Sequence, residues 1–90
     1  MEMYFKIGEV ASMFDISIRA LRLYDKIGLL KPEYTDEKTG YRYYTADQLS
    51  LLNTILVLKA LGIKLIDIKR LVDNSFNPEI LIEILQNKQE

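Results

Sequence analysis

Two arginines three residues apart, Arg19 and Arg22, have the type and spacing best suited to recognise an anionic polymer. On a helix, residues i and i+3 lie side by side on one face. A guanidinium on that face can bridge O6 and N7 of guanine in the major groove of duplex DNA, or it can bind a phosphate. Ser17 precedes the pair as a good N-cap, and the unpaired amides of a helix N-terminus attract phosphate. Residues 17–22 are therefore expected to begin a DNA-reading helix.

A second basic and aromatic segment lies at residues 38–43. Arg42 stands between Tyr41 and Tyr43, and because side chains alternate across a strand, Arg42 faces one side and both rings face the other. Lys38 is expected at the tip of the hairpin. In one interpretation Arg42 binds phosphate while a ring packs on the sugar-phosphate backbone. In the other, the rings are half-buried and Arg42 is an edge charge that prevents aggregation.

Two further residues allow two interpretations each. Tyr24 follows Ser17 by seven residues, which returns it to the same helix face, so its hydroxyl could reach a phosphate, but it could equally be a buried ring. Lys64 precedes an apolar helical pattern and could touch the DNA backbone from that helix's N-terminal end. It could equally be an exposed loop lysine.

The composition excludes several kinds of chemistry. Without Cys or His the chain lacks thiolate ligands, the commonest metal ligand and the commonest general base. No glycine-rich phosphate loop is present and the acidic residues are scattered singly, so we expect no enzyme, cofactor or metal site. No run approaches the eighteen or so apolar residues that span a membrane, and no secretory signal is visible. We therefore expect a cytoplasmic protein with no membrane partner.

The net charge of -1 conceals an uneven distribution. Residues 17–43 carry six basic against four acidic side chains, and residues 59–70 carry four basic against one acidic. The remaining stretches are acidic. Two basic faces on a nearly neutral body are therefore compatible with binding to phosphates, although solvated helix faces would give the same pattern.

Spacing and capping residues predict the elements that position these side chains. Apolar residues recur at helical spacing over 7–14, Asp15 suits a sharp turn, and a second helix over 18–27 ends at Gly28. Short runs at 29–31 and 41–44, separated by a turn-rich segment, predict a hairpin with Pro32 on an edge strand.

Three more helices are expected after the hairpin. Thr45 and Gln48 form a capping box at the start of a helix that ends at Gly62, and Tyr44 can pack against Leu49 as a hydrophobic staple. Apolar spacing predicts a helix over 65–72 and another that begins at Pro78. The apolar stripe of this last helix, marginal alone in water, either folds back on the domain or begins a longer pairing helix.

In these motifs the chain resembles the DNA-binding domain of the MerR family, the mercury-resistance-type transcription regulators. The resemblance covers residues 4–73 without a gap. It is carried by IGEVA at 7–11, SIRALRLYDKIGLLKP at 17–32, GYRYY at 40–44 and LKALG at 58–62.

The resemblance implies a mainly α, winged helix-turn-helix fold with a small β-hairpin and a short C-terminal helix. Residues 7–26 would form the helix-turn-helix, 31–44 the first wing, and the third and fourth helices a second wing. The contacts to DNA that it implies come from Ser17, Arg19, Arg22, Tyr24, Tyr41, Arg42 and Lys64. Two positions depart from the family pattern: Leu23 replaces the first of two frequent tyrosines, and Lys64 stands where a Ser cap is common.

The resemblance also implies an organisation and partners. Residues 4–73 would be the DNA-binding domain, and 74–90 a linker and the start of a dimerisation helix. Family members are typically homodimers that bind a dyad in promoter DNA and, in response to an effector, distort it so that RNA polymerase can read it. An effector-responsive activator is therefore expected.

Two alternatives remain open from the sequence. A protein-interaction module would use the leucine-rich third helix and the C-terminal stripe, so charge substitutions at Ile80 and Leu85 would matter and Arg42 would not. An excisionase-like architectural protein would bend DNA without regulating transcription directly.

Overall fold

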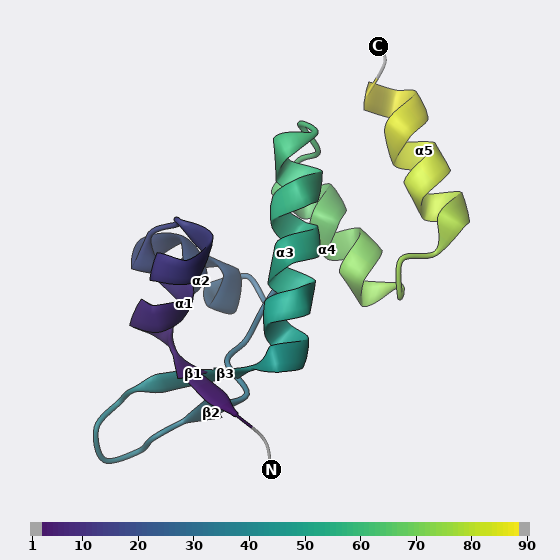
Figure 1. Ribbon diagram of the computed structural model, residues 1–90. Coiled ribbons are helices and arrows are strands. Elements are labelled where there is room, and N and C mark those ends of the chain that lie inside the picture. The colour runs from purple at the N-terminus through teal and green to yellow at the C-terminus, as the bar shows by residue number, and fades with distance from the viewer. Residues whose placement is uncertain (1–2, 89–90) are drawn as a thin grey trace. The chain divides into compact units, whose positions relative to one another are not determined.

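The computed structural model describes residues 3–88, and the chain forms two compact units, Met1–Thr54 and Ile55–Glu90. The boundary falls inside the helix α3, Ala46–Ala60. Ahead of α3 the first unit contains, in chain order, β1 Tyr4–Lys6, α1 Ile7–Phe14, α2 Ile18–Lys26, β2 Tyr34–Thr35 and β3 Arg42–Thr45 (Figure 1). After α3 the second unit contains α4 Leu65–Asp73 and α5 Pro78–Lys88.

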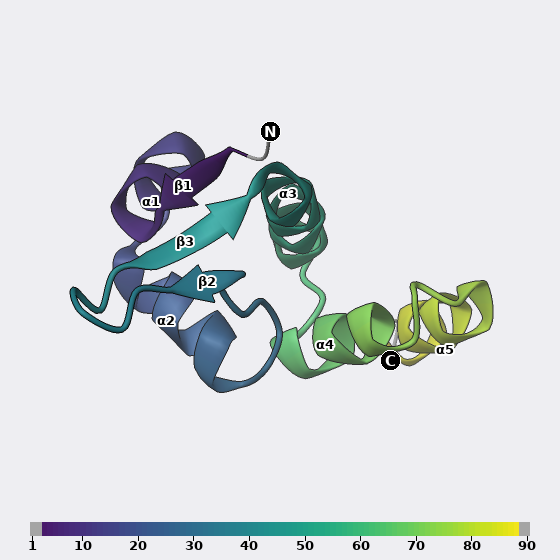
Figure 2. The same cartoon turned by 90° about the horizontal axis from the view of Figure 1, so that it is seen from below.

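The three strands form one antiparallel sheet in the order β1-β3-β2, with β3 in the centre (Figure 2). Phe5 pairs with Tyr44, and Tyr34 pairs with Tyr43. Tyr44 is fully buried, whereas Tyr43 lies on the opposite face, with its ring 6.5 Å from that of Tyr4 and 5.8 Å from that of Tyr34. Alternation along β3 therefore separates an inner face from an outer aromatic face.

The strand prediction was wrong in two places. The partner of β3 in the hairpin is Tyr34–Thr35, and neither residues 29–31 nor Pro32, expected on an edge strand, lies in a strand. The N–H groups of Leu29 and Leu30 instead donate to the carbonyl of Tyr24 (2.8 and 3.1 Å) and close the end of α2, so they are not free for a strand ladder. The strand β1 was not predicted; three residues are too few for a periodic signal.

The predicted helix-turn-helix is present in the first unit. Asp15 adopts a left-handed conformation (φ 53°), and the Ile16 N–H donates to the Ala11 carbonyl across the turn (3.0 Å). Ser17 then caps α2, because its Oγ accepts the Ala20 N–H at 3.0 Å. The helix ends at Lys26, one residue before the predicted end, and Gly28 follows with φ 77°.

The predicted capping box of α3 is also present. The Gln48 N–H donates to Thr45 Oγ1 (3.3 Å), and the Thr45 N–H donates to Gln48 Oε1 (3.1 Å). Gln48 further accepts the Glu33 N–H (3.1 Å) and donates to the Lys31 carbonyl. One side chain therefore fixes both the start of α3 and the chain that leads into the hairpin.

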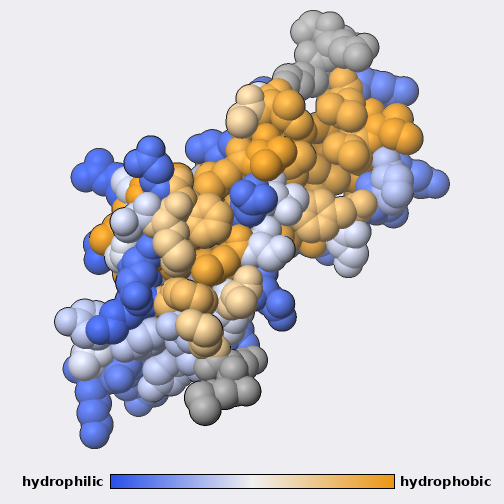
Figure 3. Space-filling view, in the orientation of Figure 1, coloured by the Kyte–Doolittle hydropathy of each residue, from blue (hydrophilic) through white to orange (hydrophobic). Residues whose placement is uncertain are grey.

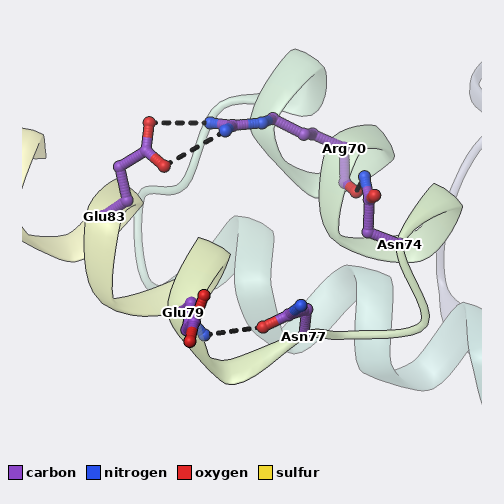
Figure 4. A network of polar contacts seen from close by, with 5 residues as sticks. All are labelled: Arg70, Asn74, Asn77, Glu79 and Glu83. Carbon is purple, nitrogen blue, oxygen red and sulfur yellow. Dashed lines mark hydrogen bonds and ion pairs between the residues drawn. The ribbon is translucent and has the colours of Figure 1, made fainter.

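In the second unit α5 packs against α4. Arg70 of α4 donates both of its terminal nitrogens to Glu83 of α5 (3.2 and 3.1 Å), while Asn77 caps α5 by accepting the Glu79 N–H at 2.9 Å (Figure 4). Ile84 is 4% exposed. Of the two possibilities for the C-terminal stripe, this part of it folds back on the preceding helix.

Much apolar surface nevertheless remains exposed in the second unit. On the face drawn in Figure 3 apolar side chains gather over this unit. The exposed residues are Val57, Leu61, Ile66, Phe76, Ile82 and Leu85. Across residues 3–88, none of the helices has the length and apolar character needed to cross a membrane.

Candidate nucleic-acid interface

A groove in the first unit brings together residues from the hairpin and from α2, which we call the recognition helix because the sequence predicts that it reads DNA. We call this groove the basic groove; it is lined by Lys6, Ile7, Gly8, Ile18, Arg22, Gly40, Tyr41 and Arg42. The predicted residues Arg22, Tyr41 and Arg42, which lie about twenty positions apart in the sequence, are thus neighbours. Three of the lining residues are cationic and none is acidic, which makes the groove suitable for an anion.

The first half of α2 presents its arginines to solvent. Arg19 and Arg22 are both exposed, while Leu21, between them, is fully buried. Among the described residues neither guanidinium forms an ion pair. Ser17, also exposed, holds the N-terminus of α2 in place through its cap. Both arginines are therefore available to a ligand, on a helix whose first turn is fixed.

Tyr24 belongs to the core. It is 1% exposed, as expected for the buried-ring alternative, so it offers no surface to a phosphate. The physical reason is its spacing from Leu21: the two are three residues apart and share the buried face of α2. Its position relative to Leu21, and not relative to Ser17, determines its environment. We therefore leave Tyr24 out of the candidate DNA contacts.

Arg42 is held against the recognition helix by an ion pair. Its Nε lies 3.5 Å from Oδ2 of Asp25, with the two side chains 33% and 25% exposed. The recorded contact uses Nε, and the guanidinium has four further N–H donors on its terminal nitrogens. The Asp25 contact shows that Arg42 faces α2, on the opposite side of β3 from Tyr43, as alternation predicted. Tyr41, which was expected on the same side as Tyr43, instead lines the basic groove together with Arg42.

Tyr44 lies close enough to this ion pair to interact electrostatically with both of its members. Burial raises the pKa of its hydroxyl, the nearby Asp25 carboxylate raises it further, and Arg42 opposes the rise. Within the described part of the chain the Tyr44 hydroxyl is the buried side-chain polar atom that lacks a hydrogen-bond partner. The Tyr44 ring lies in the core, where it anchors β3.

The hairpin tip is shaped by Asp36. Its Oδ1 accepts the N–H groups of Lys38 (2.8 Å) and Thr39 (3.3 Å), and Gly40 completes the turn with φ 76°. Lys38 is exposed at this tip, as predicted, and is not among the residues that line the basic groove. Its side chain is therefore a candidate for a contact beyond the groove.

Sequence reasoning missed Lys6. Its Nζ lies 4.9 Å from the ring centroid of Tyr41, and it lines the basic groove. Its position follows from the pairing of Lys6 with Tyr43, which depends on the unpredicted strand β1. A basic residue next to the IGEVA motif was the only available signal.

Lys64 lies in the second unit. It is exposed and occupies the N-cap position of α4, where no side chain makes a capping hydrogen bond. A lysine at this position does not supply the capping hydrogen bond that a serine side chain can make. Among residues 3–88 no group of three or more His, Cys, Asp or Glu side chains could hold a metal ion.

Comparisons with known proteins agree on one family. A family model described as MerR HTH family regulatory protein matches residues 5–75. The multidrug-efflux transporter 1 regulator of Bacillus subtilis (strain 168) is 50% identical over 72 residues, which are 80% of this chain and 26% of that protein. The chain thus spans about a quarter of that relative's length, and 32% of the transcriptional regulator BrlR of Pseudomonas aeruginosa PAO1, with 41% identity over 85 residues.

Solved structures extend the agreement to the fold. In the cryo-EM structure of the EcmrR-DNA complex in EcmrR-RPo, the matching region has a TM-score of 0.82 and 33% identity, covering 94% of this chain and 32% of that one. Both sequence relatives carry the name of a regulator. The winged helix-turn-helix prediction is confirmed, and the chain belongs to the MerR HTH family of regulatory proteins.

Proposed function

We propose that this chain binds duplex promoter DNA as the DNA-binding part of a MerR-type transcription regulator. The observation that carries the proposal is the basic groove, in which Arg22 of the recognition helix meets Tyr41 and Arg42 of the hairpin. A recognition helix contacts base edges, while neighbouring elements bind the phosphate backbone of the DNA. The basic groove contains residues suited to both kinds of contact.

The proposed contacts follow from exposure and direction. Arg19 and Arg22 face the major groove, where each reads guanine or holds a phosphate. Arg42 donates its terminal nitrogens to a phosphate, and Tyr41, 53% exposed, packs on the sugar-phosphate backbone. Further contacts are assigned to Ser17 at the start of the helix, Lys38 at the hairpin tip and Lys64 in the second wing.

A binding experiment tests these assignments. Duplexes selected from a random pool would supply a dyad site, and fluorescence anisotropy would then measure affinity for it and for a scrambled duplex over a range of salt concentrations. We expect Arg22→Ala to cost about 1–3 kcal/mol if Arg22 reads a base, with reduced preference for the dyad. Arg42→Ala should weaken binding to both duplexes equally.

Lys26→Ala is the matched control. It removes one exposed positive charge from α2 without touching the basic groove. Equal affinity of the Arg22, Arg42 and Lys26 variants would contradict the residue assignments. Wild-type binding without salt dependence would contradict DNA binding itself.

We further propose that residues 4–73 are the DNA-binding domain and that 74–90 contain a linker and part of a dimerisation helix. Support comes from the exposed apolar residues Ile82 (54%) and Leu85 (43%) on α5, which a homodimer would bury. Sedimentation with a palindromic duplex should detect two protomers per site, and Leu85→Asp should reduce this to one. A strictly monomeric wild-type complex would contradict dimerisation for this chain.

The whole regulator is proposed to be an effector-responsive activator that remodels promoter DNA for RNA polymerase in the cytoplasm. The support is the family membership, together with a relative solved as an EcmrR-DNA complex. Another matched structure is of HiNmlR, a MerR family regulator bound to promoter DNA, with a TM-score of 0.73. In vitro transcription from the selected site, with and without the chain, would test this assignment.

A further inference from the structure

Lys6 is fixed at the edge of the basic groove by two elements. It ends β1, where it pairs with Tyr43, and it precedes α1, where its backbone N–H donates to Glu9 Oε1 at 2.9 Å. Strand and helix together therefore determine where its side chain begins. A lysine anchored in this way loses less conformational freedom on binding a ligand than one in a loop.

The ammonium of Lys6 is directed over the Tyr41 ring. The distance of 4.9 Å from Nζ to the ring centroid is within the range of a cation–π contact. An ammonium has three N–H donors, and a ring face does not use all of them. Since Tyr41 is 53% exposed, the pair lies at the surface with donors left for a ligand.

The charge around Lys6 favours an anionic ligand. The basic groove also contains Arg22 and Arg42, and no carboxylate lines it. Arg42 has a partner in Asp25, but within residues 3–88 neither Lys6 nor Arg22 forms an ion pair. The positive charges of Lys6 and Arg22 are therefore not balanced by a carboxylate among the groove residues, which favours an anionic ligand between them.

We infer that Lys6, seated on the Tyr41 ring, binds a backbone phosphate of the DNA next to the groove arginines. This contact rests on the proposed function and extends it, because it adds a residue outside the helix-turn-helix and the hairpin. Lys6 contributes to affinity for any duplex and carries no sequence information of its own. The Tyr41 ring determines the direction from which the ammonium approaches.

The test is the salt dependence of binding to the dyad duplex. Each neutralised phosphate contributes about 0.9 to the slope of log affinity against log salt. Lys6→Ala should lower that slope by about 1, with an affinity loss of about eightfold at 0.1 M salt, and the loss should be equal on dyad and scrambled duplexes. Lys6→Arg should keep the slope, and the control Lys26→Ala should change it much less.

The alternatives give different results. If Lys6 only orients Tyr41, Lys6→Ala lowers affinity equally at all salt concentrations, and an unchanged slope overturns the inference. If Lys6 instead binds free phosphate, inorganic phosphate added at constant ionic strength competes with the duplex, and Lys6→Ala abolishes that competition. This result would also overturn the inference that Lys6 binds a backbone phosphate. The proposed function fails separately, through the Arg22 and Arg42 variants.

Discussion

The substitution Tyr44→Phe tests how β3, the strand that carries the arginine proposed to contact DNA, is anchored. Tyr44 is fully buried, and among the described atoms its hydroxyl has no hydrogen-bond partner. Phenylalanine keeps the ring and removes only the oxygen. The substitution therefore separates the apolar contribution of the ring from the cost of burying its polar group.

The expected change is a gain in stability. Burying a polar group without a hydrogen-bond partner destabilises the folded state by about 1–3 kcal/mol. The van der Waals contacts of the hydroxyl oxygen offset part of this cost, and phenylalanine lacks those contacts. We expect the free energy of unfolding to rise by about 1 kcal/mol. For a domain of this size, that corresponds to a rise in melting temperature of about 4–8 °C.

The gain should increase at alkaline pH. The folded-state pKa of Tyr44 is raised above its ordinary value of 10.0, mainly by burial. Tyrosine therefore ionises more easily in the unfolded chain, so the wild type has its full stability below pH 10 and loses stability as the pH rises from 10 toward the folded-state pKa. Phenylalanine has no such loss, and the difference between the two proteins isolates Tyr44 from the other tyrosines.

Thermal unfolding followed by circular dichroism between pH 7 and 11 measures both effects. The control is Tyr34→Phe, which removes a hydroxyl from a residue that is 52% exposed. It should change the free energy of unfolding by less than about 0.5 kcal/mol. A loss of stability in Tyr44→Phe at pH 7 would refute the reasoning. It would mean that the hydroxyl is hydrogen-bonded, for example to a buried water.

Substitutions at three other residues give measurable outcomes. Gln48→Ala removes the cap acceptor of Thr45 and two bonds to the preceding chain, so urea denaturation should show a loss of about 1–2 kcal/mol, and Gln48→Glu should lose less. Asp25→Asn breaks a partly exposed pair and should cost no more than about 1 kcal/mol by the same assay. Gly8→Ala adds a methyl group where no heavy atom lies within 4 Å, so it should stabilise α1 by about 0.5–1 kcal/mol. Because Gly8 lines the basic groove, fluorescence anisotropy should nevertheless show weaker DNA binding by this variant. Unchanged affinity would mean that DNA does not approach Gly8.

Elements specified by neighbouring residues could be predicted from the sequence. The caps at Ser17 and Thr45 depend on side chains within three residues of the amides that they bind, and both are present. The left-handed Asp15 and the stop at Gly28 are equally local. These features fixed the helices to within a residue or two and made the fold recognisable.

Features that depend on distant pairing could not be predicted. β1 exists because β3 provides a partner for its three residues, and β2 begins at Tyr34 because the amides of Leu29 and Leu30 are used by α2. Lys6 meets Tyr41 only once that sheet has formed. The groove arginines could be named from the sequence, but their neighbour Lys6 could not.

The register of β3 connects the features that are specified locally with those that depend on distant pairing. Tyr44 in the core and Thr45 in the capping box fix the strand at one end, and alternation then directs Arg42 toward Asp25 and Tyr41 toward Lys6. A slip of one residue would exchange the two faces and place the arginine among the outer tyrosines, away from the recognition helix. The position of the phosphate-binding arginine in the proposed interface is therefore determined by a buried tyrosine and a helix cap, neither of which needs to touch DNA.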